Sequence, residues 1–211
     1  MKTLVFGTNN RKKGIELAEL LAPYSIEVKT LADFSETLDV VEDGKTFIEN
    51  ARKKAAEQAR FLNAWVVGED SGLCVDALKG APGIYSARFA ALPKEADVIA
   101  VPLDNTSDEA NNQRLLELLK DVPWEQRTAH YTCAAALSDP SGTMCGESEN
   151  VCRGIIRFEP SGDGGFGYDP LFEITEYHQT FGELSSAVKR TISHRARTIR
   201  ELTQLILTID G

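Results

Sequence analysis

The sequence predicts a globular α/β protein, formed by one large domain or by two lobes around a cleft, and three observations lead to this prediction. The chain has 211 residues, of which 42% are hydrophobic and 26% charged, as is typical of folded proteins. Near its start, a strand-like run, a polar turn and a helical pattern follow one another over residues 3–21. A second apolar run at residues 64–67 ends in carboxylates and a hydroxyl, and polar groups at the carboxyl end of a strand lie where open α/β sheets bind ligands.

Composition and charge exclude several classes of function. The formal net charge of −9 argues against broad binding to nucleic acid or to an anionic membrane, although a few local cations can still hold a small anion. No apolar run approaches ~18 residues, and the start of the chain lacks the pattern of a signal peptide. The four cysteines lack C-x-x-C spacing and the three histidines are scattered, so we expect a reduced, cytoplasmic protein without a zinc site.

The first predicted elements form a candidate anion site. Residues 3–6 are expected to be a strand and residues 15–21 a helix that Pro23 ends, with a polar turn between them. The first N–H groups of a helix are unpaired and its dipole is positive there, and three consecutive cations at positions 11–13 favour phosphate binding. The alternative is that Asn10 caps a surface helix and the three cations are solvated.

A second strand and a second helix are expected next. Residues 26–31 have the pattern of a strand, and residues 39–44 form an acidic turn. Thr46 and Glu49 make a capping box for a helix whose apolar stripe extends to residue 62. Two lysines near the middle of this helix are either ordinary exposed residues or able to reach a phosphate.

The apolar run at residues 64–67 leads into the neighbouring acids Glu69 and Asp70. On extended backbone, neighbouring side chains point to opposite sides, but a bend at Gly72 would let both acids approach one cation. Ser71 could then donate a hydrogen bond to an anion beside them. The alternative is an acidic turn after a core strand.

Alternation and turn residues predict the middle of the chain. In order, we expect a strand (73–78), a tight turn (80–83), an irregular stretch (92–108), a helix (108–119) and two long strands (127–138 and 144–158) that a turn (139–142) joins into a hairpin.

A glycine-rich loop at residues 162–170 contains two aromatic residues and a carboxylate. Its four glycines within six residues allow unusual backbone angles and close approach. The rings can stack on a flat heterocycle, and Asp169 can bind the edge of that heterocycle. The alternative is a flexible loop whose aromatic side chains pack into the core.

The last predicted element is a long amphipathic helix with Ser193 as its N-cap and apolar positions as far as Ile209. His194 and Arg195 are expected in its first turn, away from the apolar stripe. Together with the nearby Lys189 they could contact an anion or the edge of a base. The alternative is that they are ordinary surface residues.

Six motifs, in this order, resemble those of the inosine triphosphate pyrophosphatase family, which hydrolyses nonstandard purine nucleoside triphosphates. They are Thr8-x-Asn10-x-x-Lys13, Gly44-x-Thr46-Phe47-x-Glu49-Asn50-Ala51, Glu69-Asp70-Ser71-Gly72-Leu73, Gly80-Ala81-Pro82-Gly83-x-Tyr85-Ser86-Ala87-Arg88, Gly164-Gly165-Phe166-Gly167-Tyr168-Asp169-Pro170 and Ser193-His194-Arg195. The resemblance covers nearly the whole chain.

The resemblance implies a single two-lobed domain over residues 1–211, with a long mixed β-sheet, a central substrate cleft and a homodimeric assembly. It also implies Mg²⁺-dependent hydrolysis of ITP, dITP and XTP to the nucleoside monophosphate and pyrophosphate, with one Mg²⁺ per subunit. The expected role of this activity is to cleanse the nucleotide pool.

The motifs of the family also imply roles for individual residues. Asp70 is the expected catalytic carboxylate, and Glu42 and Asp70 are the expected metal ligands. The expected phosphate contacts are Thr8, Asn9, Asn10, Arg11, Lys12, Lys13, Lys54 and Ser71. The expected nucleoside contacts are Phe166, Gly167, Tyr168, Asp169, Lys189, His194 and Arg195. The chain departs from the family pattern at Asn9, where many relatives have Gly or Thr, at Val41, where some have an acid, and at Glu69, where bacterial members often have Asp.

The chemistry follows from these roles. Asp70 is expected to position or deprotonate the attacking water, with Glu69 in the first or second shell of the metal. Lys13, Lys54 and the first N–H groups of the N-terminal helix would stabilise the leaving pyrophosphate. Arg195 and His194 can donate to the 6-keto oxygen, and Asp169 or backbone carbonyls can accept from N1–H, a pattern that adenine does not match.

Two other functions fit parts of the sequence. One is a Maf-like pyrophosphatase that acts on other modified nucleotides, against which the glycine-rich loop and the Ser-His-Arg triplet argue. The other is a nucleotide-binding sensor without turnover, against which the acids Asp70 and Glu42 and the cation Lys13 argue.

Overall fold

The computed structural model describes residues 2–93 and 104–208, which form a mixed seven-stranded sheet with helices. The strands follow the order β2-β1-β3-β4-β5-β6-β7; β1 is parallel to β2 and β3, whereas β6 is antiparallel to β5 and β7. The strands are β1 (Lys2–Phe6), β2 (Ile26–Thr30), β3 (Val66–Val75), β4 (Thr128–Ser138), β5 (Met144–Ile156), β6 (Phe172–Ile174) and β7 (Gln179–Thr180). The helices are α1 (Arg11–Leu21), α2 (Phe47–Leu62), α3 (Asp108–Leu118), α4 (Ser186–Ile192) and α5 (His194–Ile206). None of the helices within the described ranges is long and apolar enough to cross a membrane.

The chain divides into two compact units. Unit 1 contains residues 1–71, 132–151 and 190–211, and unit 2 contains residues 72–131 and 152–189. The long strands β3, β4 and β5 contribute residues to both units. The predicted α/β class and mixed sheet are therefore confirmed, and the two units are described separately below.

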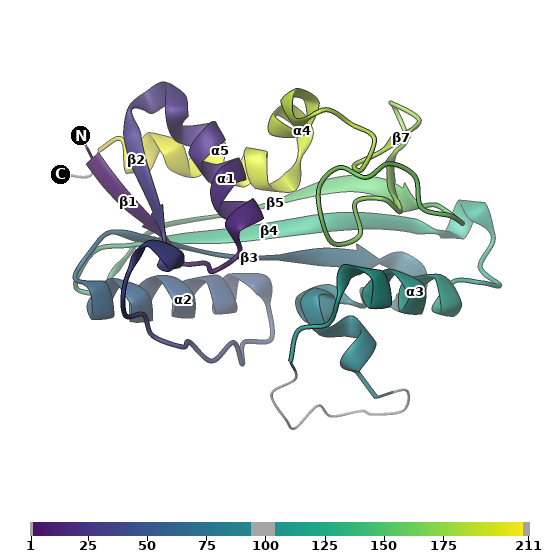
Figure 1. Cartoon of the computed structure of the whole chain (residues 1–211), viewed down its shortest axis with the longest axis horizontal. Helices are drawn as coiled ribbons and strands as arrows, with labels where there is room; N and C mark the ends of the chain where they lie inside the picture. Colours follow the sequence, from purple (N-terminus) through teal and green to yellow (C-terminus); the bar gives the residue numbers. More distant parts are fainter. Residues whose placement is uncertain (1, 94–103, 209–211) are drawn as a thin grey trace. The chain divides into compact units, whose positions relative to one another are not determined.

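Two helical layers enclose the strands of unit 1. Helices α1 and α5 lie on one face of the sheet, and α2 lies on the other (Figure 1). Leu4 and Phe6 of β1 pack into a buried cluster with apolar residues of α1 and α5, while Val5, between them, packs with Ala59 of α2 and Val66 of β3. Alternate residues of a strand thus supply two separate cores, and each large buried aliphatic side chain contributes about 1.5–3 kcal/mol.

Side-chain caps fix where three of these helices begin. Asn10 accepts from two N–H groups of the first turn of α1, Thr46 accepts from the N–H of Glu49 in α2, and Ser193 accepts from the N–H of Ala196 in α5. Each bond satisfies a donor that the helix itself leaves unpaired. The Glu49 carboxylate accepts from the N–H of Lys45 instead of Thr46, so the predicted capping box is only half formed.

Unit 2 is built around an aromatic cluster and a buried arginine. The rings of Tyr131, Phe172 and Phe181 contact one another with centroids 4.8–5.9 Å apart. Arg127 is 1% exposed and its guanidinium donates to the carbonyls of Leu119, Ile156, Val122 and Arg157. Backbone carbonyls therefore satisfy this buried cation, and the bonds join the end of α3 to β5.

The structure corrects several sequence expectations. The predicted break around residue 72 is wrong, because β3 runs without interruption from Val66 to Val75. Residues 76–78, expected to extend a strand, form a 3-10 turn. Helix α4 and the short strands β6 and β7 were not predicted. Much of the stretch expected to be irregular, residues 94–103, and the helical position Ile209 lie outside the described residues.

Candidate active site

The alternation of β3 places two adjacent acids on opposite faces of the sheet. Val67 packs on the face covered by α1 and α5, and Val66 packs on the face covered by α2. Because side chains alternate along a strand, Glu69 shares the face of Val67 and Asp70 shares the face of Val66. The hydrogen-bond partners of the two acids therefore differ, although the charge of Lys13 lowers the pKa of both Glu69 and Asp70.

Glu69 is fully buried between two cations. Its carboxylate accepts from Lys13 Nζ at 2.7 Å and from Arg195 Nη2 at 3.0 Å, and Cys133 Sγ donates to it at 3.4 Å. Burial alone would raise the pKa of Glu69, but the charges of Arg195 and Lys13 outweigh burial and hold this pKa well below its ordinary value. Glu69 is therefore ionised and holds two basic side chains in place. It does not lie on the face of the sheet that carries Asp70.

Arg195 is bound by carboxylates on both sides. Its guanidinium donates to Glu16 at 2.5 Å, to Glu69 at 3.0 Å and to Ser71 Oγ at 3.0 Å. Burial lowers its pKa, but Glu69 and Glu16 raise it further, so the net shift is upward. The sequence placed His194 and Arg195 away from the apolar stripe of the helix; in the structure both are buried, at 6% and 3% exposure. The carboxylates make burial of the Arg195 charge possible.

Asp70 lies on the opposite face and is 8% exposed. Its Oδ2 accepts from Asn50 Nδ2 at 3.0 Å, its Oδ1 accepts from the backbone N–H of Ser71 at 3.0 Å, and Lys54 Nζ is 3.6 Å from Oδ1. Burial raises the pKa of Asp70, and the nearby charge of Lys54 opposes this shift without cancelling it. A carboxylate with a raised pKa is a better proton acceptor than a solvated one.

A second carboxylate, Glu42, meets Asp70 at one ammonium group. Lys54 Nζ donates to Glu42 Oε2 at 2.8 Å while it lies 3.6 Å from Asp70. Burial lowers the pKa of Lys54, but the two acids outweigh burial and raise it. The structure thus brings together Glu42 and Asp70, as the sequence predicted, around the position of a cation.

These oxygen donors fit a magnesium ion. Among residues 2–93 and 104–208, no cluster of three or more metal-binding side chains occurs. Mg²⁺ commonly binds one or two carboxylates and takes its other ligands from phosphate oxygens and water. Glu42 and Asp70 therefore provide a donor set of the kind that Mg²⁺ uses when a polyphosphate is its other ligand.

The N-terminus of α1 carries the other predicted phosphate contacts. Thr8 Oγ accepts from the N–H of Asn10, and the Asn10 side chain accepts from the N–H groups of Lys12 and Lys13 at 3.0 Å and 3.3 Å. These N–H groups are therefore already capped, which weakens the expectation that they bind pyrophosphate. Asn9, Arg11 and Lys12 are exposed, and Lys13 Nζ donates to Ser71 Oγ as well as to Glu69.

A family match now places these residues among known proteins. The model of the Ham1 family matches residues 4–205. The chain belongs to the Ham1 family. A dITP/XTP pyrophosphatase of Rhodopirellula baltica is 51% identical over 200 residues, with coverage of 95% of this chain and 90% of that protein. One from Desulforamulus reducens is 46% identical over 203 residues, with coverage of 96% and 94%.

Solved structures of the Ham1 family have the same fold. The Ham1 protein of Staphylococcus aureus matches with a TM-score of 0.79 and 34% identity, and covers 97% of this chain and 98% of its own. A HAM1 protein from Coxiella burnetii matches with a TM-score of 0.83 and 32% identity, over 99% and 100% of the two chains. These matches confirm the family that the six motifs indicated, and they favour it over the Maf-like alternative.

Unit 2 of this Ham1 chain contains the glycine-rich loop. Tyr168 is 2% exposed, and its hydroxyl donates to the carbonyl of Ser86, so the alternative in which an aromatic ring packs into the core holds for Tyr168. Phe166 is only half-buried. Asp169 accepts from Lys189 Nζ at 2.7 Å and from the N–H of Phe166 at 3.3 Å. Asp169 and Lys189 thus shape the loop, and Phe166 is the ring that can stack on a heterocycle.

Two residues that the sequence reasoning missed hold the same loop. Asp108 accepts from the N–H of Gly167 at 2.8 Å, and Asn112 donates to the carbonyl of Gly167 at 3.0 Å. Both lie in the first turns of α3, four residues apart, and therefore on one face of the helix. They hold Gly167 on both sides, and this residue has a positive φ of 62°. The four-residue spacing of these two polar residues could have shown that they share one helix face, but it could not show which segment that face contacts.

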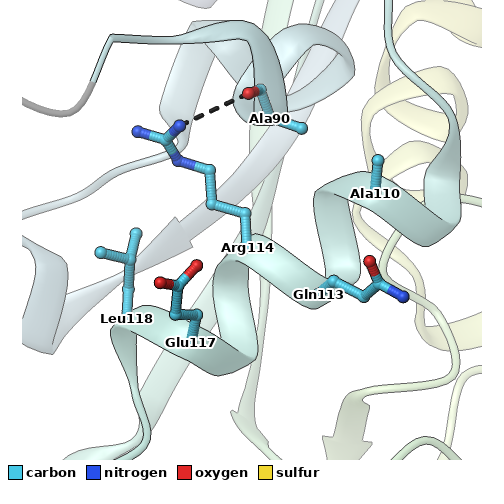
Figure 2. A pocket seen from close by; sticks show the side chains of 6 residues that line it. All are labelled: Ala90, Ala110, Gln113, Arg114, Glu117 and Leu118. Carbon is cyan, nitrogen blue, oxygen red and sulfur yellow. Dashed lines mark hydrogen bonds between the residues drawn. The ribbon is translucent and has the colours of Figure 1, made fainter.

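A separate hollow in unit 2 contains none of the predicted site residues. It has a volume of about 500 Å³ and lies along α3, where Arg114 donates to the carbonyl of Ala90 (Figure 2). Its lining residues are Ala90, Ala110, Gln113, Arg114, Glu117 and Leu118.

Proposed function

We propose that this protein is a pyrophosphatase that hydrolyses the nonstandard purine nucleoside triphosphates ITP, dITP and XTP to the nucleoside monophosphate and pyrophosphate. The observation that carries the proposal is that Glu42 and Asp70 both approach the ammonium group of Lys54. A second cluster, with Lys13 and Ser71, lies next to them. Its support from known proteins is the membership in the Ham1 family and the two bacterial relatives named dITP/XTP pyrophosphatases. The proposed role is removal of these nucleotides from the pool.

We assign the polyphosphate end of the substrate to unit 1. Glu42 and Asp70 would hold one Mg²⁺ per subunit; when bound, this ion neutralises phosphate charge and lowers the pKa of coordinated water. Lys13 and Lys54 supply positive charge for the developing negative charge on pyrophosphate. The half-buried Thr8 and the exposed polar residues Asn9, Asn10, Arg11 and Lys12 are proposed contacts of the outer phosphates, with Ser71 as a hydroxyl donor.

Asp70 is the proposed general base. Its carboxylate is held by Asn50 and by the N–H of Ser71, so its orientation is fixed before substrate binds. Burial raises its pKa, which favours uptake of a proton from the attacking water. Lys54 contacts Glu42 and Asp70 in the structure, and its ammonium group is a proposed partner of a substrate phosphate.

We assign the base to the glycine-rich loop of unit 2. Phe166 is the proposed stacking ring, and the backbone of Gly167 together with Asp169 and Lys189 is proposed to shape the edge that reads the purine. Tyr168 supports this loop from the core. A site built to bind a 6-keto oxygen and N1–H leaves its own polar groups unpaired when adenine enters, which can reject adenine by up to ~10⁴-fold.

His194 and Arg195 keep a proposed role, although the structure changes that of Arg195. The guanidinium of Arg195 is engaged by Glu69, Glu16 and Ser71, so we propose that it positions the polar residues around Ser71 and does not select the base. His194 precedes it in the first turn of α5 and remains the proposed donor toward the nucleoside. We also propose a cytoplasmic homodimer, and light scattering of the purified protein tests the dimer.

Pyrophosphate release tests the proposed function. A panel of ITP, dITP, XTP, GTP, ATP and CTP is incubated with the purified protein and Mg²⁺, with and without EDTA. We expect rapid release from the first three substrates, little from ATP and CTP, and none with EDTA. Comparable hydrolysis of ATP would contradict the base assignment. Tight binding of ITP without any release in Mg²⁺ would instead identify a nucleotide sensor.

A further inference from the structure

The segment that carries Glu42 is held along helix α2 by side chains one turn apart. Gln58 bonds the backbone N–H and carbonyl of Leu38, Lys54 bonds the side chain of Glu42, and Asn50 accepts from the backbone N–H of Gly44 at 2.8 Å. Positions 50, 54 and 58 share one helix face. The acidic turn is therefore attached to α2 at three points and is not a free loop.

Asn50 differs from the other two attachments because it also binds Asp70. Its Oδ1 accepts from Gly44 while its Nδ2 donates to Asp70 Oδ2 at 3.0 Å. The side chain is 1% exposed, so water does not compete for either bond. One buried amide thus connects the backbone next to Glu42 with the carboxylate of Asp70.

The glycine at position 44 is a second sign that this connection is built in. A Cβ on Gly44 would lie 2.6 Å from Asn50 Oδ1 and 2.8 Å from the Cβ of Glu49. Any side chain at this position would displace the Asn50 amide or the turn. The close approach of Gly44 to Asn50 therefore requires the absence of a Cβ.

We propose that Asn50 is a positioning residue, which fixes the orientation of Asp70 and the position of the turn that carries Glu42 relative to Asp70. The amide donor occupies Oδ2 of Asp70, and the amide acceptor holds the turn at the distance where Glu42 and Asp70 face one cation. Asn50 acts through these two acids and does not touch the substrate. This inference rests on the proposed function for its kinetic consequence, but its structural part stands without it.

Asn50→Ala and Gln58→Ala form a matched pair that tests the role. Both remove a buried amide of α2 with bonds to residues 38–44, but Gln58 has no bond to Asp70 among the described residues. In Asn50→Ala we expect kcat to fall by about 10–100-fold, as for partners that orient catalytic ligands, with KM for ITP nearly unchanged. In Gln58→Ala, which costs similar thermal stability, kcat should stay at the wild-type value. Equal losses of kcat in the two variants would overturn the proposal.

Amide hydrogen exchange of Gly44, measured by NMR without nucleotide or metal, is the readout that does not depend on turnover. Asn50→Ala should speed this exchange about fivefold or more, as expected when one hydrogen bond is lost, and Gln58→Ala should not. Asn50→Asp keeps an acceptor for Gly44 but faces Asp70 with a carboxylate, so it should retain protection and lose kcat. Wild-type exchange of Gly44 in Asn50→Ala refutes the connection. A wild-type protein that releases no pyrophosphate refutes the proposed function, while the exchange data still decide the role of Asn50.

Discussion

Replacing Glu69 by glutamine should destabilise the protein far more than the same change at a surface ion pair. The Glu69 side chain has no solvent exposure and pairs with Lys13 at 2.7 Å and Arg195 at 3.0 Å. Removal of one partner from a buried ion pair costs about 3–5 kcal/mol, because the remaining charge stays buried. Arg195 keeps Glu16 as a partner at 2.5 Å, and the Lys13 side chain is 16% exposed. We therefore expect a loss at the lower end, about 3 kcal/mol.

Urea denaturation at pH 7, followed by circular dichroism, measures this loss. The matched control is Glu147→Gln, which breaks the pair between Arg52 and Glu147 at 2.6 Å, where the side chains are 48% and 31% exposed. Exposed pairs contribute at most about 1 kcal/mol. If both variants lost the same free energy of unfolding, the view of Glu69 as a buried anchor would be refuted.

The pH dependence of the same variant gives the sign of the effect. Because the folded-state pKa of Glu69 lies well below the ordinary value of 4.5, its ionised form stabilises the native state. This stabilisation is fully present above about pH 4.5 and is lost as the pH falls through the folded-state pKa. The difference between wild type and Glu69→Gln should therefore be constant near neutral pH and should shrink in acid. A difference that grows below pH 4.5 would contradict this assignment.

Three further predictions follow from the same geometry. Asp70→Asn should lower kcat by at least ~10²-fold. Because burial raises the pKa of Asp70, the same variant should have a higher melting temperature in EDTA at pH 7, and a lower one would contradict this reasoning. Gly68→Ala should destabilise the protein by about 1–3 kcal/mol or more in urea denaturation, because its Cβ would lie 2.2 Å from a backbone oxygen of α2. Asp108→Ala and Asn112→Ala, which release Gly167, should lower the ratio of kcat/KM for ITP over ATP, and an unchanged ratio would separate α3 from base selection.

Local signals in the sequence predicted most of the elements. The caps Asn10, Thr46 and Ser193 bond the N–H groups that the pattern indicated, because a capping bond spans two or three residues and needs no distant partner. The two strands of the hairpin were found within two residues of their bounds. The convergence of Glu42 and Asp70 was expected from the family motifs, since these carry information about distant contacts that periodicity lacks.

Long-range charge pairing explains what the sequence did not reveal. Glu69 and Arg195 are 126 residues apart in the chain, and without this partner an acid in the middle of a strand indicated a turn. The same pair explains why Arg195 is buried although its position suggested a surface residue. For Tyr168, ligand stacking and packing into the core were both left open, because a loop gives no periodicity from which its burial could be inferred. The positions of Glu69 and Arg195 were misjudged for one reason. A polar group can be buried only when a partner satisfies it, and the local sequence does not show a partner that is distant in the chain.

The two neighbouring acids of β3 show how one strand can separate structural and chemical roles. On one face, Glu69 meets Arg195 and Lys13, whose charges keep its pKa low, so that it is ionised and unsuited to take up a proton. On the other face, burial raises the pKa of Asp70, and the charges of Lys54 and Lys13 oppose this shift without cancelling it. Environments that push the pKa values of two acids apart identify which one performs acid–base chemistry. The one-residue step between Glu69 and Asp70 therefore supports the second acid, and not the first, as the proposed proton acceptor.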